Sequence, residues 1–237
     1  IKNGPAERRR FIDLELSQLD KVYLNDLGNY NRIINQRNKL LKDISFNSGL
    51  KDTLDIWDIQ LIEYGEKVIQ ARKKFVSDIN EIISEIHKKL TGNQEKIEVI
   101  YEPNTGGQSL GDVIQRNRER DLRMMSTTSG PHRDDICFQV DGIDIRKFGS
   151  QGQQRTAALS LKLSEIELVK MLTKDKPVLL LDDVLSELDK HRQNYLLDSI
   201  DDIQTLITCT GVDEFVNHRF SINKIFYVHE GQVRNEN

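Results

Sequence analysis

The segment from residue 179 to residue 189 reads LLLDDVLSELD, and it decides how the rest of the sequence is interpreted. Three consecutive leucines predict a short buried strand of the kind found in parallel sheets. Asp182 and Asp183 follow at the carboxyl end of that strand, where open parallel sheets gather their ligands. With Glu187 and Asp189, four acidic side chains fall within eight residues. Because so many carboxylates repel one another, the segment predicts a site for a divalent cation or for the cationic groups of a partner.

A second segment, at residues 148–155, reads FGSQGQQR and precedes a strongly apolar helix expected over residues 156–172. Ser150 supplies a hydroxyl and Gly152 an unobstructed backbone amide, next to a helix start whose first N–H groups lack partners. Such a place binds an anion, although a lone serine and glycine are also typical of an ordinary helix N-cap. The order of the segments, with this helix start, an apolar helix, a buried strand and paired acids, favours the anion site.

Strands and helices alternate around these two segments. Short strands are expected at residues 178–181, 205–208 and 224–228, with a helix over 190–200. This alternation predicts an α/β fold with a parallel sheet and helices packed on it. Apolar residues alternate with polar ones on both sides of Asp141-Gly142, which predicts a β-hairpin over 136–145, and residues 96–102 predict another strand.

The first hundred residues have a different, helical character. Prolines stand only at positions 5, 103, 131 and 177, so residues 6–102 lack the commonest helix breaker. Apolar residues recur at helical spacing from Leu14 to Leu41 and again from Leu54 to Leu90, with a polar break over 43–52. Two long helices joined by a short polar turn predict an antiparallel hairpin.

Clustered arginines are the candidate nucleic-acid contacts. A helix expected over 110–125 carries four of them, Arg116, Arg118, Arg120 and Arg123, which form either a solvated face or a phosphate-contacting patch. The triplet at residues 8–10 has the same two interpretations. The formal net charge of −4 gives no overall attraction to DNA, so any DNA contact must be local.

His132 and Arg133 also leave two interpretations open. A His beside an Arg could be catalytic. Alternatively, Arg133 pairs with Asp134 or Asp135 and His132 caps a strand.

Composition excludes several classes of protein. With 37% hydrophobic and 30% charged residues, the chain is neither disordered nor collagen-like. Its longest apolar run is far shorter than the roughly 20 residues of a membrane helix, so we expect no membrane contact and a cytoplasmic location. The two cysteines, Cys137 and Cys209, lie in strand-like contexts, which predicts small buried residues.

The two diagnostic segments together resemble the signature, Walker B and D-loop segments of ABC-type ATPases. Two further segments, GPAERRRFID at residues 4–13 and SGPHRDD at 129–135, look like the RecF family of bacterial DNA-repair proteins. The resemblance covers essentially the whole chain. It implies an α/β fold made of an ABC-type ATPase half-lobe and an inserted antiparallel helical hairpin.

The family resemblance also implies a function. Members bind ATP and Mg²⁺, dimerise on DNA at gaps, stalled forks and single-strand/double-strand junctions, and act with RecO and RecR to load RecA. Such proteins serve DNA repair, recombination, replication and the SOS response.

The resemblance assigns roles to individual residues. Ser150, Gln151, Gly152 and Gln153 would contact the γ-phosphate of ATP held by the other subunit, and Ser186 and Asp189 would lie at the dimer interface. Asp182 would hold Mg²⁺ through water, and Asp183 would orient the attacking water.

The chain also departs from the ABC pattern in three places. Asp183 stands where most such ATPases have Glu, which is consistent with slow turnover. No His follows the strand at 205–208, so either this chain has no γ-phosphate sensor there, or Thr208 or Thr210 replaces the switch histidine. The sequence has no Gly-x-x-x-x-Gly-Lys-Ser/Thr segment. We therefore expect that an N-terminal portion precedes Ile1 in the natural protein, and that this chain alone is inactive as an ATPase.

The expected domains are a helical, coiled-coil-like domain over residues 1–125, whose arginine-rich start belongs to the ATPase core, and an ATPase domain over 126–237. The alternative function is that of an SMC-like structural ATPase that organises DNA, with the hairpin as the start of a long arm. About 75 residues of helix folded in two extend only about 50 to 60 Å, which favours the repair protein.

Overall fold

The computed structural model describes residues 4–185, 188–200, 202–209 and 224–235. The chain divides into two compact units, residues 1–174 and residues 175–237, and each is described by itself.

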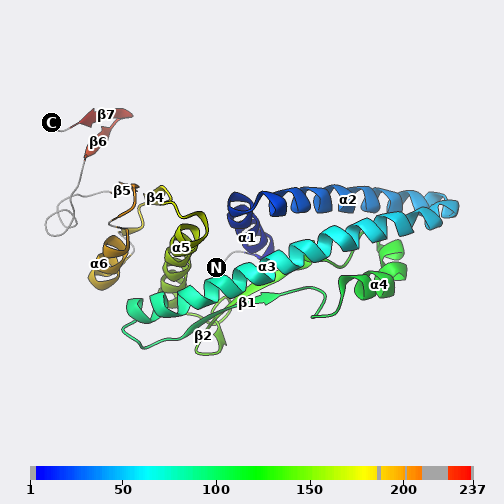
Figure 1. The fold of residues 1–237 in the computed structure, drawn as a ribbon, viewed down its shortest axis with the longest axis horizontal. Helices are drawn as coiled ribbons and strands as arrows, with labels where there is room; N and C mark the ends of the chain where they lie inside the picture. Colours follow the sequence, from blue (N-terminus) through cyan, green and yellow to red (C-terminus); the bar gives the residue numbers. More distant parts are fainter. Residues whose placement is uncertain (1–3, 186–187, 201, 210–223, 236–237) are drawn as a thin grey trace. The chain divides into compact units, whose positions relative to one another are not determined.

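The first unit is built on three successive α-helices, α1 (Pro5–Leu19), α2 (Lys21–Phe46) and α3 (Leu54–Leu90), with a 3-10 helix η1 (Ser48–Thr53) before the last. The apolar stripe that begins at Leu14 is divided at Asp20, whose backbone is extended and whose carboxylate accepts the Val22 N–H at 2.7 Å. Such an aspartate N-cap starts a new helix. Beyond it, α2 and α3 run side by side as the predicted antiparallel hairpin (Figure 1).

An antiparallel sheet forms the other part of this unit. Strand β1 (Ile97–Glu102) pairs with β2 (Asp135–Val140), from Ile97 opposite Val140 to Glu102 opposite Asp135, and β2 pairs with β3 (Ile143–Asp144). Asp141 and Gly142 make the turn with φ of +50° and +78°, and two successive positive φ values are what a two-residue hairpin turn requires. Helix α4 (Leu110–Met124) and the 3-10 helix η2 (Pro131–Arg133) lie between β1 and β2 in sequence.

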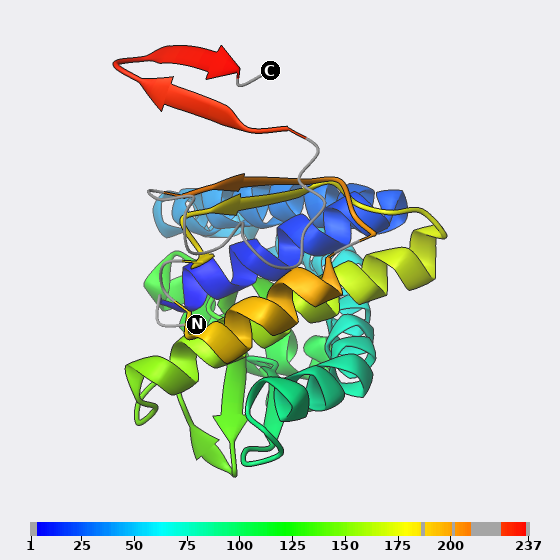
Figure 2. The same ribbon diagram turned by 90° about the vertical axis from the view of Figure 1, so that its left-hand side faces the viewer.

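Helix α3 is the centre of the unit, with α2 on one side and the β1–β2 sheet on the other (Figures 1 and 2). Helix α5 (Gln151–Thr173) packs against α3 as well. The main core cluster draws its buried residues from Ile12 to Leu168. Because β1 and β2 pair across residue 125, the expected domain boundary falls inside this unit, and the division into a helical and an ATPase domain stays a prediction.

The second unit holds the parallel strands. Strand β4 (Leu179–Asp182) pairs in parallel with β5 (Thr205–Thr208), from Leu179 opposite Thr205 to Asp182 opposite Thr208, and α6 (Lys190–Ser199) lies between them in sequence. Strands β6 (Phe226–His229) and β7 (Gln232–Asn235) form an antiparallel pair, of which only the first was predicted. The α/β fold class is confirmed. The parallel sheet has two strands in the described residues.

The expectations for the two cysteines and for membrane helices can be compared with the structure. Cys137 is buried, as predicted, but Cys209 is exposed because it follows a strand whose described residues are mostly uncovered. In the part of the chain that the structure describes, no helix combines the length and apolar character needed to cross a membrane.

Candidate functional site

The start of α5 is held by a reciprocal cap. The Ser150 hydroxyl accepts the Gln153 N–H at 3.2 Å, and the Gln153 side-chain oxygen accepts the Ser150 N–H at 3.0 Å. This capping box begins the helix at Gln151, earlier than the expected start at Thr156. The hydroxyl uses a lone pair here, so its proton remains available for a further acceptor.

Gly149 and Gly152 have different structural roles in this segment. A Cβ on Gly149 would lie 2.6–2.9 Å from atoms of Ile145, so the packing of the chain itself requires glycine there. A Cβ on Gly152 would meet only the Ser150 Oγ, at 3.9 Å. Gly152 therefore leaves its exposed side open for the close approach of an external group.

The N–H groups of Gln151 and Gly152 have no hydrogen-bond acceptor among the described residues, and both residues are exposed. Unpaired first-turn N–H groups carry the positive end of the helix dipole and suit an anion. The Gln153 side chain, in contrast, is engaged within the chain: besides Ser150, it bonds Glu95 through its amide nitrogen, at 3.0 Å.

In the second unit, the paired carboxylates follow β4 as predicted. Asp182 ends the strand, and its Oδ1 accepts the hydroxyl proton of Thr208 on β5 at 2.5 Å. Asp183 turns the chain away with a φ of +50°, and its N–H lies 3.2 Å from both the carbonyl and the hydroxyl oxygen of Thr208. Thr208, which we considered as a replacement for the switch histidine, thus contacts both acidic positions, while Thr210 lies outside the described residues.

The Asp182 site suits a magnesium ion that has few protein ligands. Mg²⁺ in phosphate-binding sites takes one or two carboxylates and completes its shell with phosphate oxygens and water. Asp182 has a second carboxylate oxygen beyond the one that Thr208 uses. Among the described residues, no three His, Cys, Asp or Glu side chains are grouped to hold a metal on their own. The donors present therefore suit a Mg²⁺ ion that arrives with phosphate.

The two interface candidates of the same loop have separate outcomes. Asp189 caps α6, since its Oδ1 accepts the Arg192 N–H at 3.0 Å and its Oδ2 lies 3.4 Å from the Arg192 guanidinium. The Gln193 side chain donates to the carbonyls of Leu185 and Leu188 and holds the preceding turn. Ser186 lies outside the described residues.

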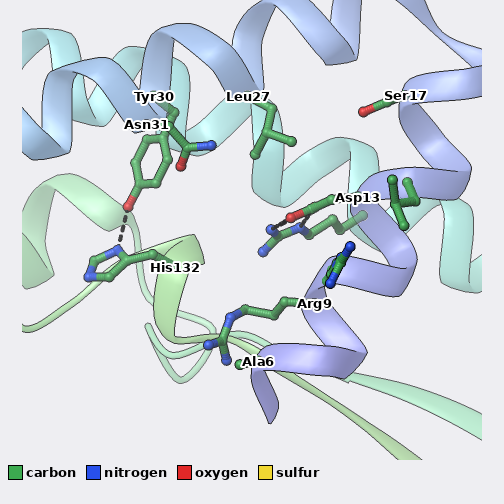
Figure 3. A pocket seen from close by; sticks show the side chains of 11 residues that line it. Ala6, Arg9, Asp13, Ser17, Leu27, Tyr30, Asn31 and His132 are labelled. Carbon is green, nitrogen blue, oxygen red and sulfur yellow. Dashed lines mark hydrogen bonds and ion pairs between the residues drawn. The ribbon is translucent and has the colours of Figure 1, made fainter.

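A cavity of about 350 Å³ opens between α1, α2 and η2 in the first unit (Figure 3). Its lining includes Arg72 of α3, which is 2% exposed and bonds the Asp13 carboxylate at 2.8 and 3.1 Å and the Pro131 carbonyl at 2.7 Å. Asp134 adds a second carboxylate to Arg72 at 3.3 Å, and it also accepts a hydrogen bond from Tyr101. This buried network ties α1, α3 and the start of β2 together.

His132 of η2 lines the same cavity and has a structural role. Its Nε2 lies 3.1 Å from the Thr127 carbonyl, which can only accept, so Nε2 carries the proton and Nδ1 accepts the Tyr30 hydroxyl at 2.7 Å (Figure 3). Burial lowers the pKa of His132 to about 4. The ring is therefore neutral at physiological pH and both its nitrogens are occupied. This arrangement supports the structural interpretation of His132 over the catalytic one.

The arginines near His132 have other partners than the sequence predicted. Asp135 pairs with Arg8 through two bonds of 2.7 and 2.8 Å and with Arg146 at 2.9 Å, not with Arg133 as expected. Arg9 donates to the Asp134 carbonyl at 2.8 Å. Arg10 lines the cavity, and neither it nor Arg133 has an ion-pair partner in the described ranges. Asp134 and Asp135 have partners that are distant in sequence, because the chain at the start of β2 lies against α1 and α3.

The four arginines of α4 do not form one patch. Arg118 pairs with Asp55 and Asp58 at the start of α3. The other three follow one another at positions i, i+4 and i+7, so they share a single exposed stripe of the helix. Arg116 donates to Gln108, whereas Arg120 and Arg123 have no ion-pair partner in the part of the chain described. Of the predicted patch, Arg116, Arg120 and Arg123 remain available for phosphate.

The parallel pair β4–β5 with carboxylates at its end, and the capped glycine-containing start of the apolar helix α5, are those of the ABC-type ATPase fold. No protein-family model matches the chain. Curated relatives named DNA replication and repair protein RecF include that of Lachnospira eligens, 60% identical over 239 residues, and that of Agathobacter rectalis, 61% identical over 233 residues. The chain belongs to the RecF family.

Solved structures agree with this assignment. Two structures of the recombination mediator protein RecF in the RecFOR pathway, one described as RecF-ATPrS and one as RecF-ATP, match with TM-scores of 0.88 and 0.89 and identities of 37% and 36%. They cover 99% and 100% of this chain. The chain spans 66% of the length of the Lachnospira protein, 64% of the Agathobacter protein and 64% of each solved chain.

Proposed function

We propose that this chain is the signature-bearing and Walker B-bearing part of a DNA replication and repair ATPase that closes as a dimer around ATP. In this proposal it acts on DNA in the bacterial cytoplasm, at gaps and stalled forks, and works with RecO and RecR to load RecA. The names of its relatives and the ATP-bound RecF structures support this proposal. The observation that carries it is the exposed start of α5, where an open glycine, two unpaired N–H groups and a serine hydroxyl converge.

The chemistry follows from these donors. Ser150, Gln151 and Gly152 would bind the γ-phosphate of an ATP molecule held by the other subunit, because all three present N–H or O–H donors to an anion. At the nucleotide held in the same subunit, Asp182 would hold Mg²⁺ and Asp183 would orient the attacking water. ATP would then serve as the bond between two subunits. A long organising arm, as in the SMC-like alternative, receives no support from α3, whose 37 residues extend about 55 Å.

Association with a longer relative tests the proposal directly. The 237-residue chain should bind full-length Lachnospira eligens RecF in the presence of Mg²⁺ and a slowly hydrolysed ATP analogue, and not without nucleotide. Ser150→Arg should abolish this association by placing a long cation where a hydroxyl meets phosphate. Ser150→Asp is the sharper variant, since aspartate keeps the helix cap but repels phosphate. Light scattering at increasing chain concentration gives the dissociation constant.

Ser77→Arg is the matched control, because Ser77 is exposed on α3 far in sequence from the α5 start. Unchanged association of the Ser150→Asp variant, or association that does not depend on nucleotide, would contradict the proposal.

Substitutions of Asp182 and Asp183 should have different effects when this chain is joined to a phosphate-binding loop. Asp183→Asn removes the charge that polarises water, so it should slow hydrolysis at least a hundredfold while ATP affinity stays nearly the same. Asp182→Asn should weaken Mg²⁺-dependent ATP binding and dimerisation together. Equal loss of ATP binding in both variants, in a titration with Mg²⁺ present, would show that this division of roles is wrong.

A further inference from the structure

Glu95, in the turn between α3 and β1, connects the end of α3 to the start of α5. Its Oε1 accepts the Gln153 side-chain N–H at 3.0 Å, and its Oε2 lies 3.4 Å from Nε2 of His87 on α3. His87 is fully buried, and its Nδ1 lies 2.8 Å from the hydroxyl of Ser160 on α5. Three side chains thus join the last turns of α3 to the capping box of Ser150.

Donor and acceptor rules place a proton in this chain of contacts. The single hydroxyl proton of Ser160 goes to the Thr156 carbonyl at 2.8 Å, so Ser160 accepts from His87 and Nδ1 carries a proton. In a neutral ring, Nε2 would then present a lone pair to the Glu95 carboxylate. Nε2 and the Glu95 Oε2 lie 3.4 Å apart without a hydrogen bond between them.

Glu95 also decides which way the Gln153 amide points. The carboxylate can only accept, so it takes the NH₂ end and leaves the amide oxygen for the Ser150 N–H. Without the carboxylate, the amide loses the partner that selects this orientation. The backbone of Ser150, and with it the hydroxyl on Oγ, is then held by the helix cap alone.

We propose that Glu95 and His87 are positioning residues for the nucleotide contact of Ser150, and that they tie this contact to the long helix α3. This inference rests on the proposed function. It adds that α3 and the phosphate-binding end of α5 move as one body where the two helices pack together. In this proposal neither residue touches the nucleotide. Both act through Gln153.

The first test is the exchange rate of the Ser150 amide proton in the 237-residue chain, followed by NMR. Glu95→Ala should raise that rate about tenfold, the effect of losing about one net hydrogen bond of 1.4 kcal/mol. It should also weaken the nucleotide-dependent association with full-length Lachnospira eligens RecF by about the same factor. Glu98→Ala is the matched control, because Glu98 is exposed on β1 close to Glu95 in sequence.

Conservative variants separate positioning from general stability. Glu95→Gln should restore both measurements to within about threefold, because its amide oxygen accepts from Gln153 and its NH₂ can donate to the Nε2 lone pair of His87. His87→Gln reaches the Nε2 position and should preserve the link to Glu95. His87→Asn reaches only the Nδ1 position, so it should raise the exchange rate and weaken association.

Each outcome bears on one claim. An unchanged Ser150 exchange rate in Glu95→Ala, or a Glu95→Gln variant as impaired as Glu95→Ala, would overturn the positioning role. Unchanged association in Glu95→Ala while Ser150→Asp abolishes it would also overturn that role. Unchanged association in Ser150→Asp would instead contradict the proposed function, and the exchange rates would still decide whether Glu95 positions Ser150. If Glu95→Ala fails to fold, the two His87 variants provide the same comparison.

Discussion

His132 has a neighbour on each ring nitrogen, and the neutral ring has one N–H to donate. Nε2 donates to the Thr127 carbonyl, while Nδ1 accepts from Tyr30, whose side chain is 1% exposed. Adding a second proton to the ring would reverse the direction of the Tyr30 hydrogen bond and bury a charge. Burial accordingly lowers the pKa of His132 from 6.5 to about 4.

The stability of the chain should therefore depend on pH through His132. Because the folded pKa lies below the unfolded one, the contribution is complete above pH 6.5 and is lost as the pH falls toward 4. Relative to His132→Gln, the unfolding free energy of the natural chain should fall by up to about 1.4 kcal/mol per pH unit in that window. Urea unfolding at several pH values measures the difference. His191→Gln, at an exposed position on α6, should leave it unchanged, and equal pH slopes for the natural chain and His132→Gln would contradict this account.

The carboxylates at the end of β4 and the serine before α5 could be predicted from the sequence, because each depends on the strand or helix that directly adjoins it. The partners of Arg72 could not, since Asp13 and Asp134 lie 59 and 62 positions away. A signal was nevertheless present. Arg72 falls between Val68 and Phe75 on the apolar stripe of α3, and a charge on a buried helix face needs a buried partner.

At the scale of elements, Arg37 joins three helical segments of the hairpin's far end. It is fully buried on α2, and it bonds Asp58 of α3 at 2.6 Å, Asp121 of α4 at 2.7 Å and Thr127 at 2.8 Å. Replacing it by alanine would leave the buried carboxylate of Asp121 without its cation and Asp58 with Arg118 alone, at 3.6 Å.

Arg37→Ala should lower the unfolding free energy by about 3–5 kcal/mol, the usual effect of removing one partner from a buried ion pair. Urea unfolding of the chain measures this loss. Arg32→Ala, on an exposed face of the same helix, should change stability by less than about 0.5 kcal/mol. A loss below about 1 kcal/mol in Arg37→Ala would mean that the two carboxylates are not left desolvated.

The exposed stripe of α4 should contribute to DNA binding and Arg118 should not. Removing a cation that touches one phosphate lowers the slope of log affinity against log salt by about one. Arg120→Gln with Arg123→Gln should therefore reduce that slope by about two, measured by fluorescence anisotropy with a gapped duplex at salt concentrations from about 50 to 200 mM. Arg118→Gln should leave the slope unchanged because that guanidinium already pairs with Asp55 and Asp58. An unchanged slope in the double variant would place the DNA-binding surface elsewhere.

Elements with a strong period were predictable and their ends were less so. The long stripes of α2 and α3 each repeat over several turns, which makes the hairpin plain. The start of α5 was placed too late because Gly152 and three glutamines mask its helical period. The serine three positions before Gln153 already signalled a capping box. The break at Asp20 depends on one residue with an extended backbone, and the spacing of the apolar residues does not change there.

At the scale of the whole molecule, the first unit should fold without the second. The residues of its main core cluster lie between Ile12 and Leu168, and the unit ends at Lys174. A protein of residues 1–174 should therefore give the same amide NMR peaks for α2, α3 and the β1–β2 sheet as the full chain. Broad, collapsed peaks would show that residues 175–237 are needed to complete that core.

The pairing of Arg8 with Asp135 spans 127 positions and has a consequence for biosynthesis. A growing chain exposes the arginine long before the aspartate is made, at roughly 5–20 residues per second. The α2–α3 hairpin can close locally in the meantime, and α1 can already meet it through the ion pair of Asp13 with Arg72. The contact of α1 with β2 must wait about ten seconds or more at the middle of that range of rates. The order of synthesis thus makes the joint between the first helix and the sheet one of the last parts of this unit to form.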